Sequence, residues 1–231
     1  MLILALESSS VCASAALAED GRLLSQYFLN SGGTHSRTLM PMLEDMLKNA
    51  AVPLERVDVV AVAAGPGSFT GVRIGVAAAK GLAWAAGKPC CPVSSLEAMA
   101  MPVSHMDGTV VSVMDARRQQ VYNALFCARG GVLTRLCPDR AVGIEELAQE
   151  LKKEENPKIL VGDGAQLCYN QISEFGVSLA PPHLRMPGAW GVAMAAFPKA
   201  AAGELVDAKE LRPVYLRLSQ AERERLEKLK K

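Results

Sequence analysis

The chain has 231 residues, half of them apolar, which is enough for one large domain or two small lobes. Its 25 basic and 24 acidic residues give a net charge of +1, which excludes a chain that holds nucleic acid through a broad basic field of its own. The longest small-apolar stretch, 75–87, falls short of the roughly 20 residues that span a bilayer, and the six cysteines lack zinc-ligand spacing, so we expect a cytoplasmic protein with free thiols.

The first hundred residues predict three strands followed by alternating helices and strands. Strands are expected at 2–6, 12–18, 22–29, 57–63 and 91–93, and helices at 36–50, 72–86 and 95–101. The turn-prone residues between the first three strands indicate a meander. The predicted order is therefore βββαβαβα.

The second half repeats this plan. Strands are expected at 110–114, 120–128, 132–136 and 158–161, and helices at 144–153, 165–172 and 189–202. Such a repeat predicts an α/β protein with two ribonuclease-H-like lobes. We place an N-terminal lobe at 1–104, a C-terminal lobe at 105–218 and a charged tail at 219–231, for which a solvated or frayed helix is expected.

A glycine-rich turn, Gly65-Pro66-Gly67-Ser68-Phe69-Thr70-Gly71, connects a predicted strand to the helix 72–86. Such a turn serves either to hold an anion on backbone amides or to let another helix come close. The spacing fails the P-loop pattern because Gly71 is followed by Val72-Arg73, and it fails the dinucleotide pattern because Thr70 replaces the third glycine. We therefore expect no phosphate motif and no bound cofactor.

The helices 36–50 and 72–86 carry more apolar surface than one core needs, which predicts a partner surface. The second helix has a stripe of small residues at steps of four: Gly71, Gly75, Ala79 and Ala83. The first has an apolar stripe with two methionines beside it: Leu39, Leu43, Met46, Leu47 and Ala50, with Met40 and Met42. For the small-residue stripe, packing inside one domain is an equally ordinary explanation.

Two carboxylates, Glu7 and Asp115, end the first strand of each half and occupy equivalent positions. In two-lobed phosphotransferases such carboxylates hold a metal and activate water. The alternative is a local cap or ion pair, for which Arg117 and Arg118 are available to Asp115. Two other candidates are nucleophile pairs, Ser94-Ser95 and Cys90-Cys91, but they lie outside a Gly-x-Ser-x-Gly elbow and are expected in turns and caps.

Together these motifs resemble the TsaB (YeaZ) family over nearly the whole chain. The resemblance rests on the glycine-rich turn extended to Gly75, on Asp115-Ala116-Arg117, and on the strings at 3–9, 35–36, 39–41, 93–98, 121–122, 162–164 and 213–217. It implies an actin/sugar-kinase/Hsp70 (ASKHA) fold and a non-catalytic partner of TsaD, the enzyme that transfers threonylcarbamoyl to the adenosine beside the anticodon. It also implies a TsaE homologue (ATPase) and tRNA as further members of the complex, and a homodimer when the chain is alone.

The same resemblance implies that the chain is not the catalyst and holds no metal. Ser95 and Met99 stand where the catalytic paralogue carries a His-x-x-x-His metal pair. Family members associate through their first two helices, which assigns the partner interface here to His35, Leu39, Met40, Leu43, Met46, Leu47, Gly71, Val72, Gly75, Ala79 and Ala83. On this hypothesis Gly75→Arg abolishes association with TsaD.

Two alternatives remain. One is an ATP-dependent enzyme of the same fold that uses Glu7 and Asp115 at a metal-nucleotide site; many relatives have Asp in place of Glu7, whereas Glu-Thr-Ser occurs in the catalytic paralogue. The other is a peptidase, an activity once attached to relatives, which the missing metal pair and nucleophile elbow disfavour.

Overall fold

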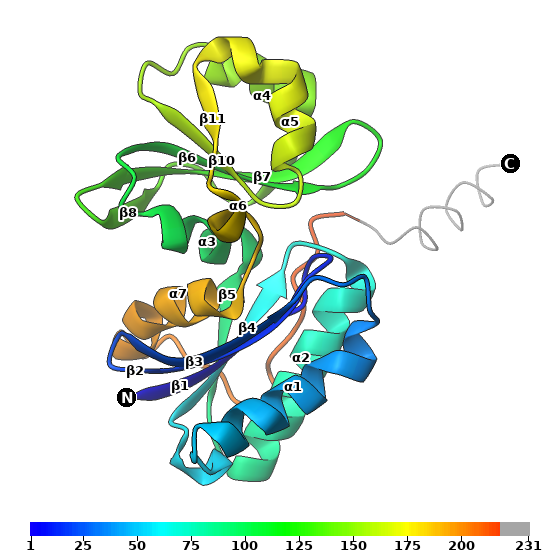
Figure 1. The fold of residues 1–231 in the computed structure, drawn as a ribbon, viewed down its shortest axis with the longest axis vertical. Coiled ribbons are helices and arrows are strands. Elements are labelled where there is room, and N and C mark those ends of the chain that lie inside the picture. The colour runs from blue at the N-terminus through cyan, green and yellow to red at the C-terminus, as the bar shows by residue number, and fades with distance from the viewer. Residues whose placement is uncertain (218–231) are drawn as a thin grey trace, which may run out of the picture.

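The computed structural model of the chain describes residues 1–217, which form two lobes, each built on its own β-sheet (Figure 1). The first sheet has the order β3 (Arg22–Leu29), β2 (Ala13–Glu19), β1 (Leu2–Glu7), β4 (Val59–Gly65) and β5 (Cys90–Ser94). Its first three strands pair antiparallel, and β1, β4 and β5 pair parallel. This arrangement confirms the predicted meander followed by crossover connections.

The second sheet repeats the first. Its order is β11 (Val177–Leu179), β10 (Lys158–Val161), β6 (Gly108–Asp115), β7 (Gln120–Arg129) and β8 (Val132–Arg135), with β9 (Arg140–Gly143) paired to β7. Strand β6 pairs antiparallel with β7 and parallel with β10, as β1 does with β2 and β4. The duplicated ribonuclease-H-like plan predicted from the sequence is therefore confirmed.

The helices cover both faces of each sheet (Figure 1). Outside the first sheet lie α1 (His35–Asn49) and α2 (Phe69–Ala86), and outside the second lie α4 (Ile144–Leu151) and α5 (Ala165–Ile172). Between the sheets lie α3 (Ser95–Ala100), α7 (Ala189–Ala201) and the short α6 (Pro182–Arg185). The side chains of β1 alternate between the two faces of the sheet. Leu2, Leu4 and Leu6 pack toward α1 and α2. Ile3 and Ala5 pack toward α7 on the other face.

Most predicted boundaries lie within three residues of the observed ones, and the misses are short elements. Strands β9 and β11 and helix α6 have four residues or fewer and were not predicted. Helix α2 begins at Phe69, because the Ser68 hydroxyl accepts a hydrogen bond from the Gly71 amide at 3.2 Å and caps it. Among residues 1–217, no helix is both long and apolar enough to cross a bilayer.

The placement of α7 differs from the predicted division of the chain at residue 104. This helix belongs to the expected C-terminal lobe, yet it packs on the inner face of the first sheet. A Cβ atom at Gly191 would lie 2.0 Å from the Ala98 carbonyl oxygen, so glycine allows α7 to lie directly against α3. The following segment also returns to the first lobe, where the Val214 amide donates to the Ala64 carbonyl at 2.7 Å. The charged tail predicted at 219–231 lies outside the described residues.

Candidate functional site

Helices α1 and α2 lie side by side on the outside of the first lobe (Figure 1). Most of the predicted interface residues, however, are buried against this chain's own core. Those buried between the helices and the first sheet are Leu39, Leu43, Met46, Gly71, Val72, Gly75, Ala79 and Ala83. Their apolar atoms already contact this chain's own core. These eight residues of the predicted interface therefore form part of the lobe's interior, and the interface itself stays a prediction.

Close packing within the lobe explains the glycines of the predicted stripe. A Cβ atom at Gly71 would lie 2.1 Å from the Ser8 carbonyl oxygen, and one at Gly75 would lie 2.5 Å from the Ser8 hydroxyl. The Ser8 hydroxyl donates to the Gly71 carbonyl at 2.9 Å. The stripe thus seats α2 on the loop that follows β1. Since Gly75→Arg would disrupt this contact, that variant reports on folding and not on a partner.

The outward side of the two helices carries a second set of small and apolar residues. Three small residues recur at steps of four on the exposed side of α2: Ala77, Gly81 and Ala85. Trp84 stands beside them with 72% of its surface exposed, and Met40 of α1 is 43% exposed. A Cβ atom at Gly81 would meet no atom within 4 Å. The sequence shows the spacing of these residues, but it does not show which side of α2 faces outward.

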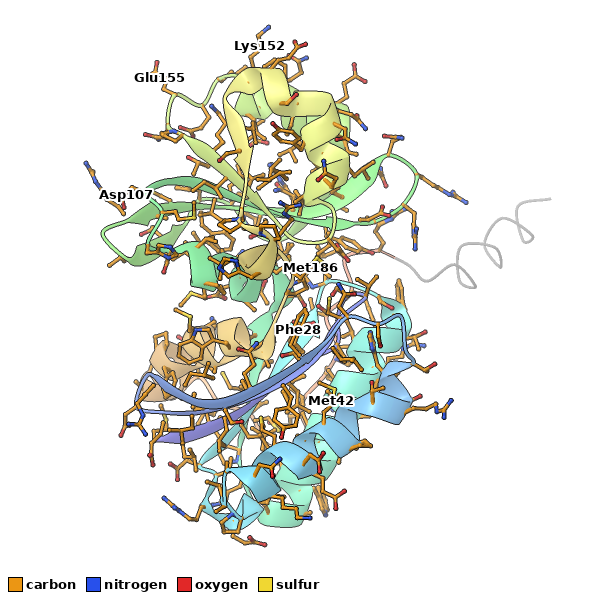
Figure 2. All side chains as sticks on the ribbon, in the orientation of Figure 1. Phe28, Met42, Asp107, Lys152, Glu155 and Met186 are labelled. Carbon is orange, nitrogen blue, oxygen red and sulfur yellow. The ribbon has the colours of Figure 1, made fainter. Side chains whose placement is uncertain are left out.

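Two further residues of the predicted interface are only half buried, and both belong to α1. His35 opens the helix, and its Nε2 atom lies 2.8 Å from the Ser10 carbonyl oxygen. Leu47 packs against the edge of the core. Met42, labelled in Figure 2, is likewise half buried on α1. The outward surface of α1 and α2, which we call the outer helical face, therefore includes Met40, Ala77, Gly81, Trp84 and Ala85, with His35 and Leu47 at its margins.

A cavity of about 680 Å³ opens between the two lobes. One wall of the cavity consists of the loop after β1 and the start of α2. The other wall consists of the end of β6 and Asp163. Met186, which is labelled in Figure 2, also lines the cavity and lies between the two lobes. Asp115 accepts a hydrogen bond from the Arg117 amide at 2.7 Å and pairs with the Arg117 guanidinium at 3.4 Å. The local pairing that the sequence offered as an alternative for Asp115 is thus present.

Glu7 ends β1 as predicted, but its carboxyl group is enclosed. Its Oε1 accepts a hydrogen bond from the Ser9 amide, while Oε2 has no hydrogen-bond partner among residues 1–217. Burial raises the pKa of Glu7 to about 7, and contacts with Ser9 oppose this rise only in part. Burial also raises the pKa of Asp163, whose Oδ1 accepts from the Asp115 amide, to about 6.

These carboxyl groups do not fit a metal-nucleotide site built on Glu7 and Asp115. Glu7 is partly protonated near neutral pH, and Arg117 already neutralises Asp115. Within residues 1–217, no three His, Cys, Asp or Glu side chains are grouped so that they could hold a metal ion. Of these two residues, only the salt-bridged Asp115 lines the cavity, together with Asp163, whereas the Glu7 carboxyl group is buried.

The enclosed carboxyl group of Glu7 makes stability depend on pH. Its pKa of about 7 in the folded chain exceeds the ordinary glutamate pKa of 4.5, so the folded chain keeps a proton that the unfolded chain releases between these values. Stability therefore falls as the pH rises through this range, by on the order of 3 kcal/mol. Glu7→Gln is expected to remove the loss of stability that Glu7 causes, whereas the loss that Asp163 causes remains. Urea unfolding of the wild type and the variant between pH 5 and 8 measures the free energy of unfolding. If that energy depends on pH in the same way in both chains, the pH dependence does not come from Glu7.

The candidate nucleophiles have structural roles. The Ser94 hydroxyl accepts from the Glu97 amide at 3.2 Å, capping α3, and donates to Asp139 at 2.6 Å. Cys90 and Cys91 are buried in β5, and burial raises the pKa of each thiol to about 11. Such thiols are protonated near neutral pH and are poor nucleophiles. The expected turn and cap role holds for Ser94, whereas the cysteines lie in a strand.

Two ribonuclease-H-like lobes that face each other across a cavity define the ASKHA class of proteins, to which actin, sugar kinases and Hsp70 belong. Residues 29–222 match the family model described as "TsaD: tRNA N6-adenosine threonylcarbamoyltransferase". The chain is 33% identical to the tRNA threonylcarbamoyladenosine biosynthesis protein TsaB of Bacillus subtilis, with all of both chains covered. It is 31% identical to the TsaB of Escherichia coli, over 94% of this chain and 95% of that one.

A solved structure supports the same assignment. It is a Pseudomonas aeruginosa protein described as uncharacterized with similarity to peptidase YEAZ, which superposes with a TM-score of 0.79 at 28% identity. The superposition covers 94% of this chain and 99% of that one. The chain belongs to the TsaB family.

Proposed function

We propose that this chain is the scaffold subunit of the complex that makes threonylcarbamoyladenosine in tRNA. It binds the TsaD homologue, helps to recruit the TsaE homologue and tRNA, and contributes contacts rather than chemistry. The full-length relatives are named as proteins of this biosynthesis. Its free cysteines suit a reducing compartment, and we place it in the cytoplasm.

The observation that carries this proposal is the outer helical face. Small residues at steps of four let a partner helix approach the backbone of α2 closely. Trp84, exposed to 72%, supplies an aromatic anchor, a residue type that often dominates binding energy at interfaces. Met40 adds an adaptable apolar side chain from α1. The same face serves the homodimer when the chain is alone, so the two associations compete.

The non-catalytic role is supported by the residues of α3. Ser95 and Met99 stand where the catalytic paralogue is expected to carry its metal pair, and both are buried in the interior. Met99 belongs to the apolar core beneath the second sheet. A catalytic metal at this helix would need imidazole ligands that face the cavity, and these two side chains supply packing instead.

Association with the TsaD homologue tests the proposal. We expect a mixture of the two chains to sediment as a heterocomplex, and the homodimer of this chain to be depleted as the TsaD homologue is added. Sedimentation velocity with one chain labelled measures both species. A mixture that sediments as the sum of its separate components would contradict the proposal.

The interlobe cavity favours one second candidate, an ATP-dependent enzyme that uses Glu7 and Asp115. The enclosed Glu7 carboxyl and the Arg117–Asp115 ion pair count against it. We expect titration calorimetry to detect no saturable binding of ATP and magnesium at millimolar concentration. Tight binding that Glu7→Gln abolishes would support the enzyme instead.

A further inference from the structure

Two arginines, Arg117 and Arg217, line the cavity between the lobes, and two more, Arg73 and Arg118, are linked to them by contacts or by sequence. Arg73 lies on α2, Arg117 and Arg118 lie in the turn between β6 and β7, and Arg217 ends the described chain. The Arg217 guanidinium donates to the Ala116 carbonyl, next to Arg117. The Arg73 guanidinium donates to the Tyr215 hydroxyl at 2.8 Å, two residues before Arg217. These contacts connect Arg73 and Arg217 with the turn of Arg117, and Arg118 follows in the same turn. We call the four residues the arginine cluster.

The turn that carries Arg117 and Arg118 has a strained and well-anchored backbone. Arg117, Arg118 and Gln119 have φ angles of 66°, 57° and 57°, a left-handed run that costs roughly 1–2 kcal/mol per residue. Gln119 fixes the turn, because its carbonyl accepts from the Ile144 amide and its side chain accepts from Gln171, both at 3.1 Å. Such strain persists only where the surroundings enforce it. The turn therefore holds the backbone of its two arginines in a fixed position.

The positive charge of this surface is only partly balanced locally. The Arg117 side chain is 86% exposed, and Arg118 is exposed without an ion-pair partner among residues 1–217. The acids that line the adjoining cavity are Asp115, which pairs with Arg117, and Asp163, so four arginines stand against two carboxyl groups. In a chain with a net charge of only +1, the cluster is a local concentration of positive charge.

We propose that the arginine cluster binds the phosphate backbone of RNA, namely the tRNA that the complex modifies. This inference rests on the proposed function and names a surface of this chain that touches that RNA. Guanidinium groups bind phosphate oxygens in a bidentate way, and the fixed backbone of the turn keeps Arg117 and Arg118 next to each other. A few phosphate contacts supply only weak affinity at physiological salt. The contact therefore matters when a second subunit holds the rest of the tRNA.

The test is the salt dependence of tRNA binding by the complex of this chain with the TsaD homologue. Each phosphate contact contributes about 0.7–0.9 to the slope of log K against log salt concentration. We expect Arg118→Ala to lower the slope by one such unit and the double variant Arg117→Ala/Arg118→Ala to lower it by about two. Arg118→Lys is expected to leave the slope unchanged, because it keeps the charge. Fluorescence anisotropy of labelled tRNA between 50 and 300 mM salt, roughly the range where such slopes are resolved, measures it.

Two controls separate an RNA contact from other effects. Arg129→Ala changes an exposed arginine at the opposite end of β7, about 30 Å away along the strand, and is expected to leave the slope unchanged. Arg118→Asn suits a positive φ angle better than alanine does, so agreement between the two variants excludes a folding effect.

An unchanged slope in the double variant would overturn the RNA contact while leaving the proposed function intact. Weaker tRNA binding caused by loss of the TsaD homologue, seen by sedimentation of the same variants, would also overturn it and assign the cluster to a protein contact. Failure of the wild-type chain to bind the TsaD homologue would count against the proposed function instead. In that case the same comparison on the isolated chain at low salt tests the RNA contact independently.

Discussion

Gly81→Arg is expected to abolish association with the TsaD homologue while leaving the chain folded. A Cβ atom at this position meets no atom within 4 Å, so the lobe tolerates a side chain there. Replacing a glycine in a helix interior also stabilises the helix by about 1 kcal/mol. At the outer helical face, however, the long charged side chain keeps a partner helix from approaching. We expect affinity to fall at least about 100-fold, which corresponds to about 2.7 kcal/mol.

A matched control separates this effect from a general effect of added charge. Ala201→Arg places the same side chain at the exposed end of α7, on the opposite face of the first sheet. We expect its affinity for the TsaD homologue to equal that of the wild type. Titration calorimetry measures all three chains, and urea unfolding verifies that they are folded. Wild-type affinity in Gly81→Arg would remove α2 from the interface.

Gly71→Ala is expected to destabilise the chain strongly, although it adds a single methyl group. The new Cβ atom would lie 2.1 Å from the Ser8 carbonyl oxygen, and neither the helix nor the loop after β1 can move away without disturbing the core. We expect a loss of about 3 kcal/mol, at the upper end of the usual cost of overpacking. Urea unfolding at constant pH measures it.

The same substitution ten residues later in α2 provides the comparison. Gly81→Ala is expected to raise stability by about 1 kcal/mol, because alanine is the better helix former and its methyl group meets open space. The two variants therefore shift the unfolding midpoint in opposite directions. Equal shifts would mean that α2 does not present Gly71 inward and Gly81 outward.

Much of the fold could be predicted because the strand patterns are duplicated. Three strands followed by alternating helices and strands occur twice, and both sheets have that topology. The position of α7 could not be predicted in this way, because alanine, glycine and valine occur around the whole helix and periodicity does not say which sheet such a helix covers. Its close approach to α3 depends on Gly191, a single residue whose contact is made over a long sequence distance.

The sequence pointed to helices α1 and α2 as a partner surface, which stays a prediction, but it did not show which side of α2 faces outward. Helix α2 carries small residues at steps of four on two sides, one beginning at Gly71 and the other at Ala77, and the sequence does not distinguish inward from outward. The placement of Glu7 and Asp115 at equivalent strand ends was correct. The approach of Asp163 to Asp115 follows from the pairing of β10 with β6, a topological fact that could have been used to find it.

Omission of single components from the reconstituted modification reaction tests most directly whether this chain supplies contacts rather than chemistry. The reaction contains tRNA, the threonylcarbamoyl donor, ATP, this chain and the TsaD and TsaE homologues, and modified adenosine is counted by mass spectrometry of digested tRNA. We predict modification with all three proteins, its loss or sharp decrease without this chain, and none with this chain alone. Modified adenosine formed by this chain without the TsaD homologue would contradict the account.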